Sequence, residues 1–331
     1  MSVRALLPDA ATPLSHESAA AAFADILDGR TGEEEVATFL VTLAEREETA
    51  IEIAEAARAL RARLIPIAAP PGAIDVCGTG GDGHHTLNVS TAVSLVVAAA
   101  GVPVAKHGNR AASSKAGAAD TLEALGLDMA VAGALAEQTL ADLGICFLFA
   151  GNHHPAMKRI QPIRQRIGRR TIFNLMGPLA NPAHVTRQLL GIARPDFAPV
   201  YAAALDSLGA EGAAIVSGEE GLDELSGAGP SVVLTVGDVS LAPTIVPEDA
   251  GLVRAPLAEI RGGDPAFNAL ALRRLLKGDR NAYREAVLLN AAAAFVIAGR
   301  VESLEDGAAL GAETIDRGDA EALLDRWIAY A

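Results

Sequence analysis

A predicted succession of strand, glycine-rich loop, helix and second strand between residues 74 and 110 constrains the fold more than any other feature of this chain. Residues 74–77 are a short apolar run typical of a buried strand. A helix is expected from an N-cap at Ser90 to about Ala100, ending at Gly101, and residues 102–105 are predicted to form the second strand. Two strands joined by one helix indicate a parallel sheet. The connecting loop contains four glycines: Gly78, Gly80, Gly81 and Gly83.

Two polar loops are expected at one edge of this sheet, because the carboxyl ends of parallel strands lie together. One is the glycine-rich loop, and the other is K-H-G-N-R at residues 106–110. No Asp or Glu occurs between Asp82 and Asp120, whereas Lys106, Arg110 and Lys115 fall in that interval. Glycine amides, a helix N-terminus and cationic side chains are the groups that hold phosphate. The stretch therefore predicts an anion-binding site.

The same glycines match the dinucleotide-binding fingerprint as Gly78-x-Gly80-x-x-Gly83. About six residues separate Gly83 from the predicted helix, and the second strand ends in Lys106 and His107 instead of an acid that could bind a ribose. We therefore favour a phosphate site over a nicotinamide or flavin site. The G-x-x-x-x-G-K-[ST] motif of nucleoside-triphosphate loops does not occur in the sequence.

Composition narrows the expected partners of the 331-residue chain. Its net charge is −14, and it has one Trp and three Tyr, so neither nucleic acid nor an anionic membrane is an expected partner. The sequence has no run of about 18 apolar residues and no apolar signal segment, which predicts a cytoplasmic protein without a membrane anchor. Cys77 and Cys146 lie in apolar runs and are expected to be buried, reduced thiols.

An α/β fold is predicted, with a small N-terminal helical domain and a larger domain whose mostly parallel central sheet is flanked by helices. Capping boxes of Thr31 with Glu34 and of Thr49 with Glu52 are expected to open two of the N-terminal helices. Pro70 follows the last of them. One helix is expected over residues 128–143. Further strands are expected at residues 145–149, 191–194, 212–216, 231–236 and 244–246, and four helices after them.

A second stretch without acids extends from Leu143 to Pro195. As a group its basic residues suit an anionic ligand or a carboxylate from another domain. Spacing alone does not distinguish Arg164 from Arg166 or Arg169. The histidine doublets at residues 84–85 and 153–154 are expected to make loop and core hydrogen bonds instead of binding a metal. The basic residues are Lys158, Arg159, Arg164, Arg166, Arg169, Arg170, Arg187 and Arg194.

Asp223 and Glu224 are one of several acidic pairs in the chain, and spacing does not say which of these pairs binds metal. They follow the strand predicted at residues 212–216, which places them at the same sheet edge as the two polar loops. Hard carboxylate oxygens suit Mg²⁺, which needs few protein ligands because phosphate and water supply the rest.

Several motifs together resemble the anthranilate phosphoribosyltransferases. G-T-G-G-D-G…T-L-N-V-S-T and K-H-G-N-R-x-x-S-S-K are similar to that family's phosphoribosyl-diphosphate loops. Further matches are H-P-A-M-K, P-I-R-Q-R-I-G-R-R-T-I-F-N-L-M-G-P-L-A-N-P, G-L-D-E-L-S and A-V-L-L-N-A-A-A-A. The resemblance implies a helical domain of residues 1–70, to which about 155–185 return, and an α/β domain of residues 71–154 and 186–331.

The resemblance implies an activity as well. Such a protein transfers the phosphoribosyl group of 5-phosphoribosyl 1-diphosphate to the amine of anthranilate, giving N-(5-phosphoribosyl)anthranilate and diphosphate. This is the second step of tryptophan biosynthesis from chorismate. A homodimer joined through the helical domain is also implied. No residue is assigned as an acid or base, because the reaction requires a neutralised leaving group and an oriented amine more than a proton acceptor.

Site residues carry over from the family position by position. Gly78, Asn109 and Arg164 would bind anthranilate. Ser90, Asp223 and Glu224 would hold Mg²⁺, with two ions per subunit. Phosphoribosyl diphosphate would be bound by Gly78, Gly81, Asp82, Thr86, Asn88, Val89, Ser90, Thr91, Lys106, His107, Gly108, Asn109, Arg110, Ser113, Ser114 and Ala118.

The chain departs from the family pattern at two positions. Ala116 stands where relatives usually have Ser, and Phe267 where Glu is common. Two alternatives remain. A pyrimidine-nucleoside phosphorylase of the same fold is disfavoured by K-H-G-N-R, and a non-enzymatic, nucleic-acid-binding paralogue is disfavoured by the acidic composition and the intact loops.

Overall fold

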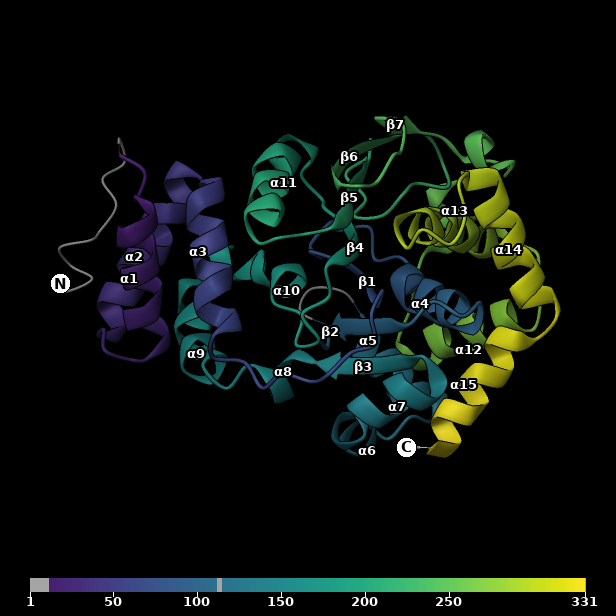
Figure 1. Ribbon diagram of the computed structural model, residues 1–331, viewed down its shortest axis with the longest axis horizontal. Helices are drawn as coiled ribbons and strands as arrows, with labels where there is room; N and C mark the ends of the chain where they lie inside the picture. The colour runs from purple at the N-terminus through teal and green to yellow at the C-terminus, as the bar shows by residue number, and fades with distance from the viewer. Residues whose placement is uncertain (1–11, 112–114, 331) are drawn as a thin grey trace.

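The computed structural model describes residues 12–111 and 115–330. A seven-stranded sheet lies at its centre, in the order β3-β2-β1-β4-β5-β6-β7 (Figure 1). The first five strands pair in parallel, and β6 and β7 are added antiparallel, which confirms the mostly parallel sheet. The strands are β1 (Ile74–Gly78), β2 (Val104–Gly108), β3 (Ile145–Phe149), β4 (Arg187–Gly191), β5 (Gly212–Gly218), β6 (Ser231–Gly237) and β7 (Thr244–Ile245).

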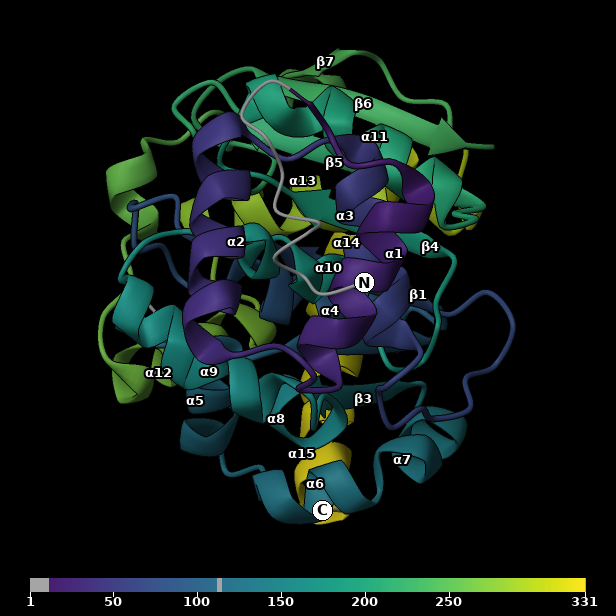
Figure 2. The same cartoon turned by 90° about the vertical axis from the view of Figure 1, so that its left-hand side faces the viewer.

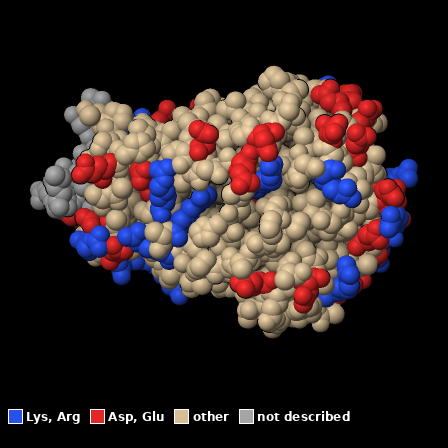
Figure 3. All heavy atoms as spheres, in the orientation of Figure 1, with Lys and Arg blue, Asp and Glu red and all other residues tan. Residues whose placement is uncertain are grey.

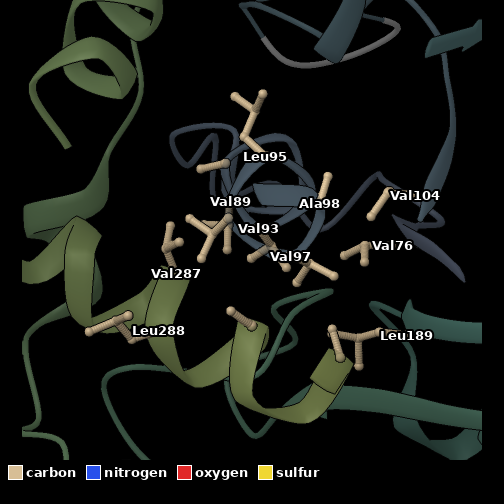
Figure 4. Close-up of a cluster of buried hydrophobic side chains, with 14 of the residues drawn as sticks. Val76, Val89, Val93, Leu95, Val97, Ala98, Val104, Leu189, Val287 and Leu288 are labelled. Carbon is tan, nitrogen blue, oxygen red and sulfur yellow. The ribbon is translucent and has the colours of Figure 1, made fainter. Parts of the chain in front are cut away.

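One face of the sheet is covered by helices of the largest hydrophobic cluster. Val76, Val104 and Leu189 from three adjacent strands belong to this cluster, together with Val93 and Val97 of α4 (Figure 4). Because α4 has small and branched apolar residues on its buried side, it packs directly on the parallel strands. The helices are α4 (Val89–Ala99), α5 (Ala118–Leu125), α12 (Pro265–Leu276), α13 (Ala282–Ile297), α14 (Leu304–Asp316) and α15 (Asp319–Tyr330).

The other face of the sheet contacts a second group of helices. Along β5, Ala214 and Val216 belong to the first cluster, whereas Ala213 and Ile215 belong to the second, as expected for a strand buried on both faces. Helix α9 comes from the middle of the chain and packs beside α1 and α2 (Figure 2). The boundary between two domains near residue 70 stays a prediction. The helices are α1 (His16–Leu27), α2 (Glu33–Arg46), α3 (Ala50–Arg61), α9 (Met157–Ile167), α10 (Met176–Leu179) and α11 (Ala198–Ser207).

Two predictions about helices are wrong. The single helix expected at residues 128–143 is divided at Leu135 (φ −102°, ψ 11°) into α6 (Met129–Ala134) and α7 (Ala136–Leu143). Helix α2 starts after Gly32, which offers no side chain, so the capping box of Thr31 with Glu34 does not form. The capping box of Thr49 with Glu52 is confirmed at the start of α3. A short helix, α8 (Ala150–His153), directly follows β3.

Strand boundaries and the start of α4 also differ from the predictions. The strand expected at residues 191–194 is instead β4, which begins at Arg187. Its first two residues are polar, so the apolar pattern of the sequence did not indicate that the strand starts there. The Gln188 Nε2 donates to the Pro178 carbonyl at 2.7 Å. The second strand is shifted, so Lys106 lies within β2 instead of in the following loop. Asn88, not Ser90, is the N-cap residue of α4.

The helices of the described residues and the face drawn in Figure 3 bear on the expected partners. None of the helices within residues 12–111 and 115–330 combines the length and the apolar character needed to cross a bilayer. On the face drawn in Figure 3, basic side chains occur in small groups interrupted by acidic ones.

A matched pair of phenylalanines tests the assignment of the core. We expect Phe295→Ala, which empties a fully buried position of α13, to lower the free energy of unfolding by about 3–5 kcal/mol. Phe267→Ala on α12 is the control, because that side chain is 54% exposed, and we expect a change within about 0.5 kcal/mol. Urea denaturation measures both. Equal losses would contradict the packing described.

Candidate functional site

A cleft of about 590 Å³ opens where the loops after β1, β2 and β5 meet. In the sheet, β1 lies between β2 and β4. The chain continues from β1 to β2 on one side of β1, and β4 is added later on the other side. Open α/β sheets bind ligands at such a point, where the strand order reverses. The predicted site residues that line the cleft are Gly78, Gly81, Asp82, Thr86, Asn88, Val89, Ser90, Lys106, His107, Gly108, Asn109, Arg110, Ala118, Arg164, Asp223 and Glu224.

One predicted residue in the described part of the chain, Thr91, is not among those lining the cleft. Thr91 is buried in the first turn of α4, and its Oγ1 has no hydrogen-bond partner among the described residues. Ser113 and Ser114 lie outside the described residues.

The floor of the cleft depends on two glycines at the ends of adjacent strands. A Cβ added to Gly191 would overlap the backbone carbonyl of Asp223, and one added to Gly78 would overlap the Asp223 carboxylate. The Gly80 N–H donates to Asp223 Oδ2 at 2.7 Å. The metal-loop residue Asp223 therefore crosses the ends of β1 and β4 at backbone distance, which only glycine permits at these positions. Gly191 is a site residue that the sequence analysis missed.

The loop after β1 is held by a segment far along the chain. Gly80, Gly81 and Gly83 have positive φ values, which favour glycine. The Leu87 N–H donates to the Ile260 carbonyl at 2.8 Å, and the Gly262 N–H donates to the His85 carbonyl at 2.8 Å. These backbone bonds join the end of the loop to the segment that precedes α12.

Asn88 is fixed by its neighbours and therefore does not cap α4 with its side chain. Its Oδ1 accepts from Thr121 Oγ1 at 2.6 Å and from Asn268 Nδ2 at 2.9 Å. Its backbone carbonyl accepts from Tyr283 Oη at 3.0 Å. Neither Asn268 nor Tyr283 could be identified from the sequence, because they lie about 180 or more residues away.

Lys106 places a cation beneath the N-terminus of α4. The residue is buried, with 3% of its surface exposed. Its Nζ donates to the Val76 carbonyl at 2.7 Å and to Ser90 Oγ at 3.2 Å. A buried ammonium, a helix N-terminus and exposed loop amides together favour an anionic ligand in this part of the cleft.

Asp223 and Glu224 are carboxylates that lack a cationic partner within ion-pair distance among the described residues. Burial, followed by the nearby carboxylate of Asp82, raises the pKa of Asp223 to about 7. Burial, followed by Asp223 itself, raises the pKa of Glu224 to about 8. A divalent cation would relieve both effects, and oxygen donors are the ligands that Mg²⁺ prefers. In the described chain no cluster of three or more His, Cys, Asp or Glu forms a metal cage, so phosphate and water would complete the coordination.

His107 is a neutral ring that joins β2 to α10. Its Nδ1 lies 2.7 Å from the Gly177 carbonyl, and its Nε2 lies 3.2 Å from Nε2 of His154. Since a carbonyl only accepts, His107 donates from Nδ1 and accepts from His154 at Nε2. Burial, together with His154, lowers the pKa of His107 to about 3, and burial lowers that of His154 to about 4. Both ring nitrogens of His107 are engaged, so His107 has no free nitrogen to act as a base.

The structure separates the arginines that the sequence left equivalent. Arg166 lies 3.2 Å from Glu34, Arg169 lies 3.0 Å from Glu45, and these pairs are on the surface. Arg164 instead lines the cleft, where among the described residues its guanidinium makes one side-chain hydrogen bond, to Gln161 on its own helix at 3.4 Å. Burial lowers the pKa of the Arg164 guanidinium, which remains protonated.

Arg110 lines the cleft, but its guanidinium is paired with acids of α5. Its guanidinium bonds to Asp120 at 2.9 Å and to both oxygens of Glu123 at 2.6 and 2.7 Å. These acids lie just beyond the acid-free stretch and so were not considered as partners.

The return segment after α9 supplies residues that the sequence analysis did not single out. The stretch without acids from Leu143 to Pro195 was the sequence feature that could have indicated them, but the sequence analysis selected only Arg164 from it. The further residues that line the cleft from this segment are Arg170, Phe173, Asn174, Gly177 and Pro178.

The site combines glycine amides, a buried cation and unpaired carboxylates at the edge of an α/β sheet. This combination is typical of the class of proteins that bind a phosphorylated ligand with a divalent cation. Comparison with known proteins agrees. The helical bundle domain of a glycosyl transferase family matches residues 7–64, and the a/b domain of a glycosyl transferase family matches residues 70–321. The chain belongs to the anthranilate phosphoribosyltransferases of this glycosyl transferase family.

Relatives and solved structures cover nearly the full chain. The anthranilate phosphoribosyltransferase of Sphingopyxis alaskensis is 66% identical, with 98% of each chain covered. The crystal structure of the enzyme from Thermus thermophilus is 43% identical with a TM-score of 0.91, and 96% of each chain is covered. The enzyme from Saccharomyces cerevisiae in complex with PRPP and Mg is 29% identical with a TM-score of 0.86, covering 96% of this chain and 93% of that one.

A glycine pair tests the close approach of Asp223. We expect Gly191→Ala to lower the free energy of unfolding by about 1–3 kcal/mol, because the new methyl group displaces the Asp223 backbone. Gly229→Ala is the control, because Gly229 lies in the connection between β5 and β6 with open space around an added Cβ, and it should change the free energy of unfolding by less than about 0.5 kcal/mol. Chemical denaturation measures both variants. A neutral Gly191→Ala would contradict the geometry.

The raised carboxylate pKa values predict a pH effect on the metal-free protein. Between the unfolded pKa values near about 4 and the folded values near about 7 and 8, the folded state binds more protons than the unfolded state. Stability in EDTA should therefore fall as the pH rises through this window. We expect Mg²⁺ to reduce the loss. Melting temperatures at several pH values, with Asp223→Asn as a variant that flattens the curve, measure the effect; a slope of opposite sign would contradict it.

Proposed function

We propose that the chain transfers the phosphoribosyl group of 5-phosphoribosyl 1-diphosphate to the amine of anthranilate and releases diphosphate, the second step of tryptophan biosynthesis from chorismate. The observation that carries the proposal is the convergence of the glycine-rich loop, Lys106 and the Asp223–Glu224 pair on one cleft, with Arg164 across it. The names of relatives up to 66% identical support it.

The two phosphate-bearing ends of the substrate would be bound by different parts of the cleft. The loop amides around Gly81 and the N-terminus of α4 at Ser90 would bind the anionic oxygens. Mg²⁺, present with PRPP in the yeast structure, would neutralise the leaving diphosphate when bound. Asp223 and Glu224 would hold the cation, and Lys106 would stabilise the negative charge from below.

Anthranilate would be oriented more than activated. The Arg164 guanidinium can form a bidentate pair with the substrate carboxylate, because it has no ion-pair partner of its own among the described residues. Gly78 and Asn109, which line the same cleft, would orient the amine toward the sugar carbon. His107 would not act as a base, because both of its ring nitrogens are engaged.

A homodimer through the helical domain, two Mg²⁺ ions per subunit and a cytoplasmic location are further parts of the proposal. Sedimentation velocity would detect the dimer, and a monomer at micromolar concentration would contradict it. Calorimetric titration with Mg²⁺ in the presence of phosphoribosyl diphosphate would give the number of ions.

The activity is tested with the purified full chain, Mg²⁺ and both substrates. The loss of anthranilate fluorescence should depend on phosphoribosyl diphosphate and on Mg²⁺. No consumption of anthranilate would overturn the proposal. Phosphorolysis of a pyrimidine nucleoside without Mg²⁺ would favour the phosphorylase alternative.

Two arginines of α9 provide a test of the acceptor site. We expect Arg164→Ala to raise the KM for anthranilate by about 10–100-fold, because a charged hydrogen bond of about 1.5–3 kcal/mol is lost. The KM for phosphoribosyl diphosphate should change much less. Arg166→Ala removes only surface pairs with Glu33 and Glu34 and should leave both constants within about twofold. Equal effects of the two substitutions would exclude the assigned role of Arg164.

A further inference from the structure

Asn290 is a polar side chain in the alanine-rich, buried part of α13. It is 0% exposed and is followed by four alanines that belong to the large hydrophobic cluster. Burying an amide among such residues costs free energy unless its hydrogen bonds are made. The side chain should therefore have specific partners, and the mechanism described above does not use it.

The partners of Asn290 belong to the metal loop, which we define as residues 219–226. The Asn290 Oδ1 accepts from the Leu225 N–H at 3.0 Å, and its Nδ2 donates to the Leu225 carbonyl at 2.9 Å. Nδ2 also donates to the Ala286 carbonyl, one helical turn earlier, at 2.9 Å. One amide thus satisfies both backbone groups of a single residue, as a neighbouring strand would.

This pairing requires a side chain that donates and accepts at the same time. Among side chains of this length only Asn has both groups in the required geometry, because Asp lacks the donor and Leu lacks both. Leu225 is 1% exposed, so water cannot replace the lost partner.

Leu225 directly follows the two carboxylates of the metal loop. Other hydrogen bonds connect the loop to the adjoining ends of β5 and β6, such as the Gly218 N–H to the Leu222 carbonyl at 2.9 Å and the Ser226 N–H to Ser231 Oγ at 2.8 Å. Asn290 instead connects the loop to a helix of the core. Fixing the backbone of Leu225 restricts the direction in which the preceding Glu224 carboxylate points.

We infer that Asn290 is a positioning residue, which sets the affinity of the cleft for its divalent cation by fixing the backbone of Leu225 beside Asp223 and Glu224. The inference rests on the metal site of the proposed function. Groups that orient metal ligands without touching the metal typically contribute 10–100-fold to metal affinity.

The test uses the full chain with Asn290→Leu, and with the smaller Asn290→Ala in case the first variant does not fold. Mn²⁺ is the probe, and its binding in the presence of phosphoribosyl diphosphate is followed by electron paramagnetic resonance. We expect the Kd for Mn²⁺ to rise by about 10–100-fold. Hydrogen exchange should accelerate in the peptide covering the metal loop in either variant.

Two control variants separate positioning from a general loss of packing. Leu289→Ala removes a fully buried side chain from the same helix without removing a hydrogen bond to the loop. Thr314→Val replaces another buried polar side chain, on α14, whose Oγ1 donates to the Leu310 carbonyl at 2.7 Å and not to the metal loop. Both should leave the Kd for Mn²⁺ within about threefold of the original and the exchange of the metal loop unchanged, even where the melting temperature falls.

The outcomes are distinct from those of the activity assay. Faster exchange of the metal loop together with weaker Mn²⁺ binding, in the Asn290 variants alone, supports the inference. Unchanged loop exchange, or an unchanged Kd despite faster exchange, overturns it. A chain that binds Mn²⁺ in this Asn290-dependent way but does not consume anthranilate would overturn the proposed function and leave the positioning role standing.

Discussion

The passage of the Asp223 backbone across the ends of β1 and β4 is the constraint on which the cleft depends. Gly78 and Gly191 leave no room for a side chain at either crossing. This close approach brings the Asp223 carboxylate to the Gly80 N–H at 2.7 Å and so joins the metal loop to the glycine-rich loop. Strands β1 and β4 are adjacent in the sheet although they are far apart in the sequence, and their ends together form the floor of the cleft.

The general architecture could be predicted because both faces of the parallel strands are buried, which produces short apolar runs such as Ile145–Phe149. The position of β4 could not be predicted in this way. Arg187 is polar and half-buried, Gln188 is polar and buried, and their partners, Asp238 and the Pro178 carbonyl, appear only in the folded chain. The start of α4 was misplaced for a similar reason, because its N-cap side chain bonds to distant residues.

The sequence predicted where the loops of the candidate site lie, but it did not show which of several similar residues belong to the site. Strand ends and glycines located the loops, whereas family resemblance was needed to choose Asp223, Glu224 and Arg164. In the folded chain the choice of arginine has a physical basis: Arg166 and Arg169 meet acids that are more than about 100 residues away, and Arg164 does not. Residues that act through the backbone, such as Gly191, give no charge or motif signal.

The two cations of the K-H-G-N-R segment differ in how readily they can serve an incoming anion. Lys106 is already in place under the N-terminus of α4. Arg110 is held by Asp120 and Glu123 at the surface, where such pairs contribute only about 0–1 kcal/mol each. Because these surface pairs are weak, releasing the Arg110 guanidinium from them would cost little free energy, whereas Lys106 is held by buried hydrogen bonds.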